Sequence, residues 1–174
     1  MEEKIFCAFT GHRPQSLPWK YDETAQECLL LKTTLTKEIE KLIDRNVTEF
    51  FSGLAQGVDI WAAQIVLALR EKNPVLKLHC VLPCRNQAEK WDVLAQKCHR
   101  DILEQANSVI CLNKSYHDGC MLDRNRYLVD HSSILLAVYN GSRRSGTAMT
   151  VRYAKKLGRE IIIIDPKTRL IANI

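Results

Sequence analysis

The fold of this protein is decided by residues 48–82, which read TEFFSGLAQGVDIWAAQIVLALREKNPVLKLHCVL. A short apolar run over 48–52 leads into a glycine-containing turn, then a helical pattern over 58–72 and a second apolar run over 77–82. A strand, a crossover helix and a second strand in this order form a unit in which the two strands are parallel. Apolar runs that are continuous rather than alternating are typical of strands buried on both faces.

The same alternation of strand and helix continues toward both ends of the 174-residue chain. Strands are expected over 5–10, 48–52, 77–82, 108–112, 134–139 and 160–165. Helices are expected over 22–46, 58–72, 87–106, 122–131 and 146–157. This pattern predicts one α/β domain over 1–174, a Rossmann-like three-layer sandwich with a mainly parallel sheet. Right-handed crossovers and a central first strand predict a strand order of about 3-2-1-4-5-6.

The composition excludes several classes of protein. Hydrophobic residues make up 46% of the chain and charged residues 26%, close to globular averages, so a disordered chain is excluded. No apolar run approaches the ~20 residues of a membrane span, so no membrane partner is expected. The net charge of +5 suits an anionic small molecule or a polyanion without demanding either.

The seven cysteines bear on compartment and metal binding. Since the sequence opens on an acidic stretch rather than a secretion signal, we expect reduced thiols and a cytoplasmic protein. A zinc site would have to come from the cluster of His79, Cys80, Cys84, Cys98 and His99. Zinc sites usually show two tight ligand pairs, and this cluster lacks the second pair, so we predict no metal. No cofactor is expected either.

Polar and glycine residues follow the first expected strand, which ends in Thr10, Gly11, His12 and Arg13. Ligands of open parallel sheets bind beyond the carboxyl ends of the strands, near the point where the strand order reverses. Gly11 would let the backbone approach a ligand closely, and Arg13 could grip a phosphate with a bidentate fork. The alternative is an ordinary turn with a surface arginine.

A second candidate element follows the strand over 48–52, at Ser52, Gly53, Gly57 and Asp59. Two glycines around a strand-to-helix turn expose amide groups at a helix start, which favours an anion or a sugar. The spacing matches neither a Walker A loop nor a G-x-G-x-x-G fingerprint. Asp59 could complement the helix dipole or accept hydrogen bonds from ribose hydroxyls or a base, and both interpretations stay open.

The third candidate element follows the strand over 134–139. Its small and hydroxyl residues precede the expected helix from 146 and are Asn140, Gly141, Ser145, Gly146 and Thr147. Free amides at this helix start indicate a phosphate-binding element, and a solvated loop with a helix cap is the alternative. Arg124 and Asn125 could reach the same cleft from the preceding helix, or lie on a solvated face. An aromatic side chain after the first loop, Trp19 or Tyr21, could stack on a base.

These motifs resemble those of a known superfamily. The run SGLAQGVD at 52–59 resembles the SGLAxGID signature of the DprA (Smf) family, and RNRYLVDHSSILLAVYNGSRRSGTAMTVRYAKKLGREIIIID at 124–165 resembles a later DprA stretch. The opening TGHRP at 10–14, together with the length, is similar to the smaller YpsA-like family of bacterial proteins. Both families belong to the SLOG superfamily, which also contains the LOG-type nucleotide hydrolases. The resemblance implies a Rossmann-like domain with a nucleotide-type site.

Strand ends and resemblance together mark a set of ligand-binding candidates. They are Thr10, Gly11, His12, Arg13, Ser52, Gly53, Gly57, Asp59, Arg124, Asn125, Asn140, Gly141, Ser145, Gly146 and Thr147. LOG hydrolases carry PGGxGTxxE, and the position of that glutamate is Thr150 here. A threonine cannot serve as a carboxylate base, so no catalytic residue is assigned.

The function expected from these residues is binding of a nucleotide or an ADP-ribose-like derivative by a non-catalytic sensor. Two alternatives remain. A DprA-like binder of single-stranded nucleic acid would need a basic groove, which could be built from Arg13, Arg124, Arg126, Arg143 and Arg144. A LOG-like N-glycosidic hydrolase would need an acid or base from His12, Asp59 or Asp123. A homo-oligomer is a further expectation, since SLOG relatives often pair.

Overall fold

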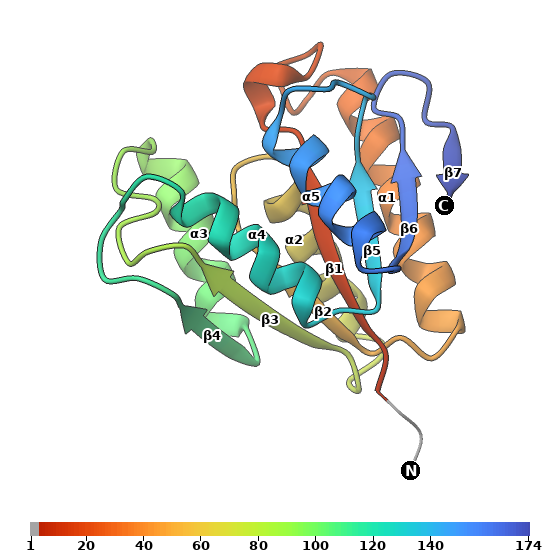
Figure 1. Ribbon diagram of the computed structural model, residues 1–174, viewed down its shortest axis with the longest axis horizontal. Coiled ribbons are helices and arrows are strands. Elements are labelled where there is room, and N and C mark those ends of the chain that lie inside the picture. Colours follow the sequence, from red (N-terminus) through yellow and green to blue (C-terminus); the bar gives the residue numbers. More distant parts are fainter. Residues whose placement is uncertain (1–3) are drawn as a thin grey trace.

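The computed structural model describes residues 4–174 and forms a sheet with helices on both faces (Figure 1). The strands are β1 (Phe6–Gly11), β2 (Glu49–Ser52), β3 (Lys77–Leu82), β4 (Ser108–Cys111), β5 (Ile134–Val138), β6 (Glu160–Ile164) and β7 (Ile171–Asn173). The helices are η1 (Pro14–Ser16), a 3-10 turn, and α1 (Gln26–Asp44), α2 (Val58–Arg70), α3 (Val93–Gln105), α4 (Cys120–Asp130) and α5 (Gly146–Lys156). The α/β class and the mainly parallel sheet are confirmed.

The strand order is β4-β3-β2-β1-β5-β6-β7, and every neighbouring pair is parallel except β6 and β7. The expected runs 3-2-1 and 5-6 are present, and the expected order is approximately right. One strand sits elsewhere: β4 lies at the edge beside β3 instead of between β1 and β5. The short strand β7, which the sequence did not predict, extends the other edge.

The position of β4 follows from which face each helix covers. Side chains of α1, α2 and α3 pack on one face around Phe9 and Trp61, and those of α4 and α5 pack on the other around Ala8 and Leu128. Figure 1 shows α4 and α5 in front of the sheet. Helix α3 covers the same face as α1 and α2, so the strand that follows it, β4, is added at the outer edge beside β3. Helix α4 covers the other face and connects β4 to β5, which pairs with β1. The order therefore reverses between β1 and β5.

Two helices begin later than their apolar patterns predict. Asp22 accepts hydrogen bonds from the backbone N–H of Thr24 (3.0 Å) and from its hydroxyl (2.6 Å), which forms a turn ahead of α1. Asp92 caps α3 by accepting a hydrogen bond from the backbone N–H of Ala95 (3.0 Å), so the helix begins at Val93. Residues 87–91, which were expected to be helical, form turns. No helix found in residues 4–174 is long and apolar enough to cross a membrane.

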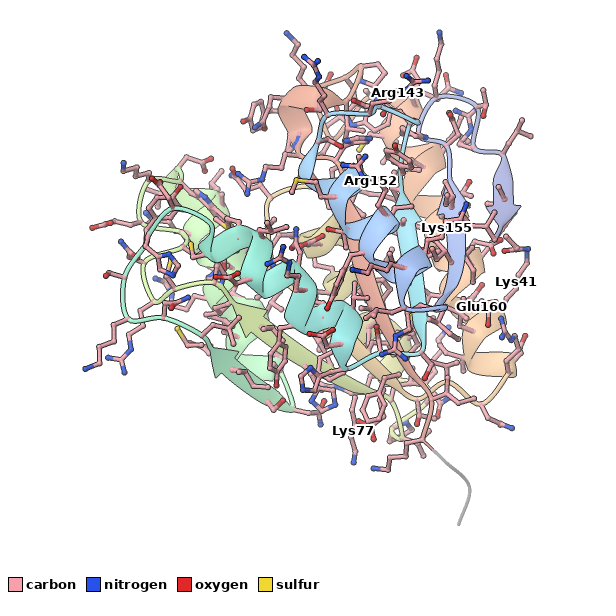
Figure 2. All side chains as sticks on the ribbon, in the orientation of Figure 1. Lys41, Lys77, Arg143, Arg152, Lys155 and Glu160 are labelled. Atoms are coloured by element: carbon pink, nitrogen blue, oxygen red, sulfur yellow. The ribbon has the colours of Figure 1, made fainter. Side chains whose placement is uncertain are left out.

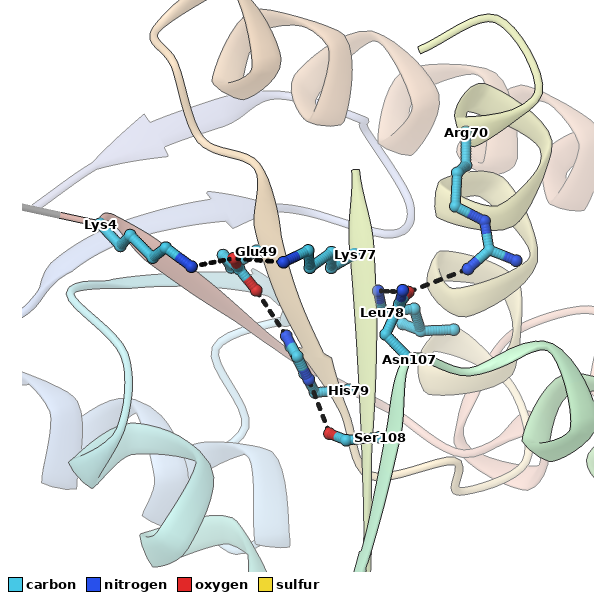
Figure 3. A network of polar contacts seen from close by, with 8 residues as sticks. All are labelled: Lys4, Glu49, Arg70, Lys77, Leu78, His79, Asn107 and Ser108. Carbon is cyan, nitrogen blue, oxygen red and sulfur yellow. Dashed lines mark hydrogen bonds and ion pairs between the residues drawn. The ribbon is translucent and has the colours of Figure 1, made fainter. Parts of the chain in front are cut away.

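A polar network ties the strands together at the end of the sheet opposite the strand tips discussed below (Figure 3). The buried carboxylate of Glu49 accepts a hydrogen bond from Lys4 Nζ (3.0 Å) and lies 2.6 Å from His79 Nε2. His79 Nδ1 lies 2.7 Å from Ser108 Oγ, so β2, β3 and β4 are joined. Burial by itself would raise the pKa of Glu49, but the contacts with His79 and Lys4 outweigh it and the pKa is lowered.

Candidate ligand-binding cleft

A cavity of about 490 Å³ lies beyond the carboxyl ends of β1 and β5, at the point where the strand order reverses. Its walls are the loop after β1, the first turn of α2 and the N-terminal turns of α4 and α5. Each helix N-terminus carries a partial positive charge and amides without an intrahelical acceptor. Three such termini on one cavity make it a favourable place for an anion.

Most of the predicted residues line this cleft. Those that do are Thr10, Gly11, His12, Arg13, Asp59, Arg124, Asn125, Ser145, Gly146 and Thr147. The lining also includes residues that the sequence analysis did not single out, namely Gln15, Ser16, Ala55, Gly119, Met121, Leu122 and Met149, together with Arg144, which it named only for a basic groove. Helical periodicity could have found Met121, since it lies four residues before Asn125 and so shares its helix face.

Ser52, Gly53 and Gly57 do not line the cleft but lie beneath it, where they shape the loop before α2. Ser52 Oγ donates to the carbonyl of Asp59 (2.8 Å) and accepts from Leu54 N–H (3.2 Å). Gly57 has a φ of +91°, and a Cβ there would lie 3.0 Å from the carbonyl oxygen of His12. The loops after β1 and β2 therefore pack directly against each other.

Arg124 points inward from α4, so the alternative of a solvated face is wrong for this residue. Its side chain is 3% exposed, and Nη1 donates to the carbonyl oxygen of Gly53. Nε donates to Asn125 Oδ1 at 2.8 Å. Gln87 Nε2 donates to the same Gly53 carbonyl at 2.9 Å. Burial lowers the pKa of Arg124, and the nearby charge of Asp59 opposes that shift.

Asp59 is 6% exposed and faces the cleft from the first turn of α2. Within residues 4–174, the hydrogen bond to its carboxylate comes from Ala55 N–H, 3.3 Å from Oδ2. That amide precedes α2, so Asp59 does not cap the helix amides of its own turn. Burial raises the pKa of Asp59, and the charge of Arg124, the Ala55 amide and Arg13 oppose the rise. A buried, under-bonded carboxylate can accept hydrogen bonds from a ligand.

Asp59→Asn is expected to flatten the dependence of stability on pH. Because the pKa of Asp59 lies above its ordinary value of 3.8, the folded protein holds this proton more tightly than the unfolded chain does. The stability that the protonated group contributes is fully present below about pH 4 and is lost as the pH rises through the raised pKa. The free energy of unfolding, measured by urea titration from pH 4 to 8, should therefore fall less with rising pH in the variant than in the wild type. A difference between the two proteins that does not change with pH would contradict this.

His12 joins the two loops at the reversal point. Its ring is buried, and Nε2 accepts a hydrogen bond from the backbone N–H of Asn140 (3.1 Å). Burial lowers the pKa of His12, in keeping with a neutral ring that accepts at Nε2. Asn140 and Gly141 lie in the loop that His12 holds, outside the cleft lining.

Helix α5 begins at Gly146, the residue at which the sequence analysis expected it to begin. Ser145 Oγ accepts from Ala148 N–H (3.0 Å), so Ser145 is the N-cap. The next two amides, of Gly146 and Thr147, have no acceptor within the helix and belong to residues that line the cleft. Thr150 is buried, and its hydroxyl donates to the carbonyl of Gly146 (2.9 Å).

The five arginines of the expected basic groove do not lie together. Arg13 and Arg144 are exposed at the cleft, whereas Arg124 lines it as a buried residue. Arg126 and Arg143 do not line the cavity, and Figure 2 shows Arg143 in the loop that precedes α5. The carbonyl of Arg143 accepts from Arg152 Nη1 at 3.1 Å.

The two aromatic residues proposed to stack on a base also lie outside the cleft. Trp19 is partly buried against the core, and Tyr21 is 62% exposed. Neither is among the residues that line the cavity at β1 and β5. The turns at 14–25 place Trp19 against the core, and the hydroxyl of Tyr21 donates a hydrogen bond to Oε1 of Gln15, a residue of the cleft lining (3.3 Å). Across residues 4–174, no group of three or more His, Cys, Asp or Glu side chains is arranged to hold a metal ion.

The sheet, its helices and the cleft at its reversal point define a Rossmann-like α/β protein with a ligand-type cavity at the strand tips. Comparison with family models then identifies the family: residues 7–168 match the model of the YspA SLOG family, and the chain belongs to that family. Family membership points to a nucleotide-related role.

Individual relatives agree with this assignment. The UPF0398 protein BH1768 of Halalkalibacterium halodurans is 30% identical over 128 residues, which cover 72% of this chain and 68% of the relative. The "Uncharacterized SPbeta prophage-derived protein YoqJ" of Bacillus subtilis is 31% identical over 153 residues, covering 79% of this chain and 89% of that protein. The X-ray structure of TM1055 shares the fold, with a TM-score of 0.53 and 18% identity over 94% of this chain and 75% of that one.

Proposed function

We propose that the cleft binds a nucleotide or nucleotide derivative and that the protein acts as a sensor of this ligand. The observation that carries the proposal is one cavity that combines three helix N-termini and two exposed arginines with a buried carboxylate. Helix amides and guanidinium groups favour phosphate, and a carboxylate favours sugar hydroxyls. The volume of about 490 Å³ falls in the range of small-molecule sites.

The lining suggests an orientation for the ligand. The amides of Gly146 and Thr147 and the guanidinium of Arg13 would hold phosphate, because they supply donors and positive charge. The buried carboxylate of Asp59 would accept hydrogen bonds from the hydroxyls of the ribose. The apolar side chains of Met121 and Met149 would contact the base.

A sensor fits this cleft better than a hydrolase of the LOG type. The hydroxyl of Thr150, at the position of the LOG glutamate, is engaged by the carbonyl of Gly146 and has no carboxylate function. One observation favours the enzyme as a second candidate: Asp59 has a raised pKa inside a cleft, as many general acids do. Release of free base from AMP, detected by chromatography and absent in the Asp59→Asn variant, would support the hydrolase.

The proposal is tested by thermal shift with AMP, ADP-ribose and a phosphate-free nucleoside. AMP and ADP-ribose are expected to raise the melting temperature further with each tenfold increase in their concentration above the dissociation constant, and adenosine to do so far less. If no nucleotide stabilises the protein at millimolar concentration, the proposal is wrong. Short oligonucleotides at two salt concentrations form a further arm, since strongly salt-dependent binding of oligonucleotides alone would favour the DprA-like alternative.

Arg13→Ala is expected to weaken AMP binding roughly tenfold or more, since hydrogen bonds to charged groups contribute about 1.5–3 kcal/mol. The melting temperature should change little, because Arg13 is exposed. Isothermal titration of both proteins measures the effect. Arg143→Ala is the matched control: it removes an equally exposed arginine outside the cleft, and it should leave the affinity unchanged. Equal losses in both variants would mean that only net charge matters.

A further inference from the structure

A second cavity, here called the aromatic groove, lies beside the cleft. It has a volume of about 410 Å³ and lies between α2, the N-terminal end of α3 and the segment before α1. Its lining includes the aromatic rings of Tyr21 and Trp91, the apolar side chains of Ile60 and Leu94, and the acids Glu23 and Asp92. No residue assigned to the proposed phosphate site lines it.

A small hollow of about 30 Å³ lies between the groove and the cleft. The hollow shares Arg13, Ala55 and Met121 with the cleft, and it shares Gln56 and Trp91 with the groove. Trp91 therefore presents its surface to both the hollow and the groove. A ligand that left the cleft past Arg13 would meet this indole next.

Trp91 is held in place by contacts that lead back to the cleft. Its ring packs edge-on against His99, with centroids 5.2 Å apart and an interplanar angle of 87°. His99 Nε2 lies 3.3 Å from Gln87 Oε1, and Gln87 donates to the Gly53 carbonyl that Arg124 also uses. A ring fixed in this way loses little conformational entropy on stacking.

The charges of the two cavities differ in sign. The cleft has Arg13, Arg144, three helix N-termini and the carboxylate of Asp59, whereas the groove has the carboxylate of Asp92 and that of Glu23, which is paired with Lys32 Nζ at 2.6 Å. Asp92 also caps α3, so this helix terminus is not open to phosphate. Aromatic rings beside carboxylates favour a neutral or cationic ring and disfavour a second phosphate.

We propose that the ligand is of the dinucleotide type, with its phosphates beside Arg13 and its second ring stacked on Trp91 and Tyr21 in the aromatic groove. This inference rests on the proposed nucleotide site and adds the class of ligand to it. The ring beyond the pyrophosphate would be a flat aromatic base, neutral or cationic, because the groove combines aromatic faces with carboxylates.

The test compares AMP, ADP-ribose and NAD⁺ as probes, because NAD⁺ and ADP-ribose differ by the second ring. By isothermal titration, NAD⁺ is expected to bind about tenfold more tightly than ADP-ribose, which is the effect of one stacked ring. Trp91→Leu and Tyr21→Leu should each reduce this advantage and leave the affinity for ADP-ribose unchanged. Trp91→Phe keeps an aromatic ring and should therefore retain most of the preference for NAD⁺ over ADP-ribose. Val93→Ala, at an exposed neighbour outside the groove lining, is the control.

Three results would overturn the inference, and each differs from a failure of the nucleotide site itself. An equal NAD⁺ advantage in the wild type and both leucine variants would show that the groove is not used. Equal losses for AMP and NAD⁺ in Trp91→Leu would show that Trp91 only shapes the cleft through Gln87. Binding of single-stranded oligonucleotides but not NAD⁺, lost in Trp91→Leu, would assign the groove to nucleic acid. If AMP and ADP-ribose also fail to bind, the proposed function fails with it.

Discussion

Replacement of Arg124 by methionine is expected to lower the melting temperature by roughly 10 °C. Loss of a hydrogen bond from a charged group costs about 1.5–3 kcal/mol, Arg124 makes such bonds to Gly53 and Asn125, and each kcal/mol shifts the melting temperature by about 2–4 °C at this size. Arg124 is 3% exposed, donates to Gly53 and lies near the buried carboxylate of Asp59. The variant leaves the Gly53 carbonyl one donor short and removes a positive charge that favours the ionised form of that carboxylate.

The matched control lies two residues further along α4. Arg126 is exposed and has only a 3.9 Å contact with Asp123, so Arg126→Met should change the melting temperature little. The double variant Asp59→Asn with Arg124→Met should recover part of the loss, because it removes the uncompensated charge as well. Circular dichroism melts of the four proteins decide the matter. Similar melting temperatures for the two arginine variants would show that Arg124 is not the support inferred here.

Gly53→Ala is the second substitution with a large expected effect, a loss of stability close to that of the Arg124 variant. A Cβ at position 53 would lie 2.7 Å from Arg124 Nε and nearer still to Cζ and Nη1. The guanidinium would have to leave its buried position and give up its bonds to Gly53 and Asn125. AMP binding should fall too, because Arg124 lines the cleft.

A double-mutant cycle isolates this cause. In the Arg124→Met background the space beside Gly53 is relieved, so Gly53→Ala should cost much less there, with a coupling of about 1–3 kcal/mol. Gly146→Ala serves as the control, because a Cβ at that glycine meets nothing within 4 Å. Additive losses in the cycle would contradict a direct clash between the alanine methyl and the guanidinium.

Several parts of the site could be predicted because they depend on local chain chemistry. The starts of α2 and α5 follow from glycine, serine and threonine placed between a strand and a helix, and both lie at the cleft. The same reasoning could not tell the residues that line the cleft from those that hold the loop in place behind it. Gly53 and Gly57 lie in the same motif as Ala55 and Asp59, but Ala55 and Asp59 line the cavity and the two glycines do not. Which residue faces a cavity depends on what packs behind the loop, in this case Arg124, His12 and Pro14.

The sequence by itself determined the alternation of strands and helices, the parallel sheet and the set of strand ends that carry polar residues, because these follow from periodicity and turn chemistry along the chain. Only the tertiary structure decided the edge position of β4, the burial of Arg124 and the position of Trp91 at the hollow beside the cleft. These features depend on which helix covers which face and on contacts between residues far apart in the sequence, 29 positions for the pairing of β3 with β4 and 71 for Arg124 with Gly53. A local pattern carries no information about such long-range packing, which is settled when the whole chain buries its apolar surface.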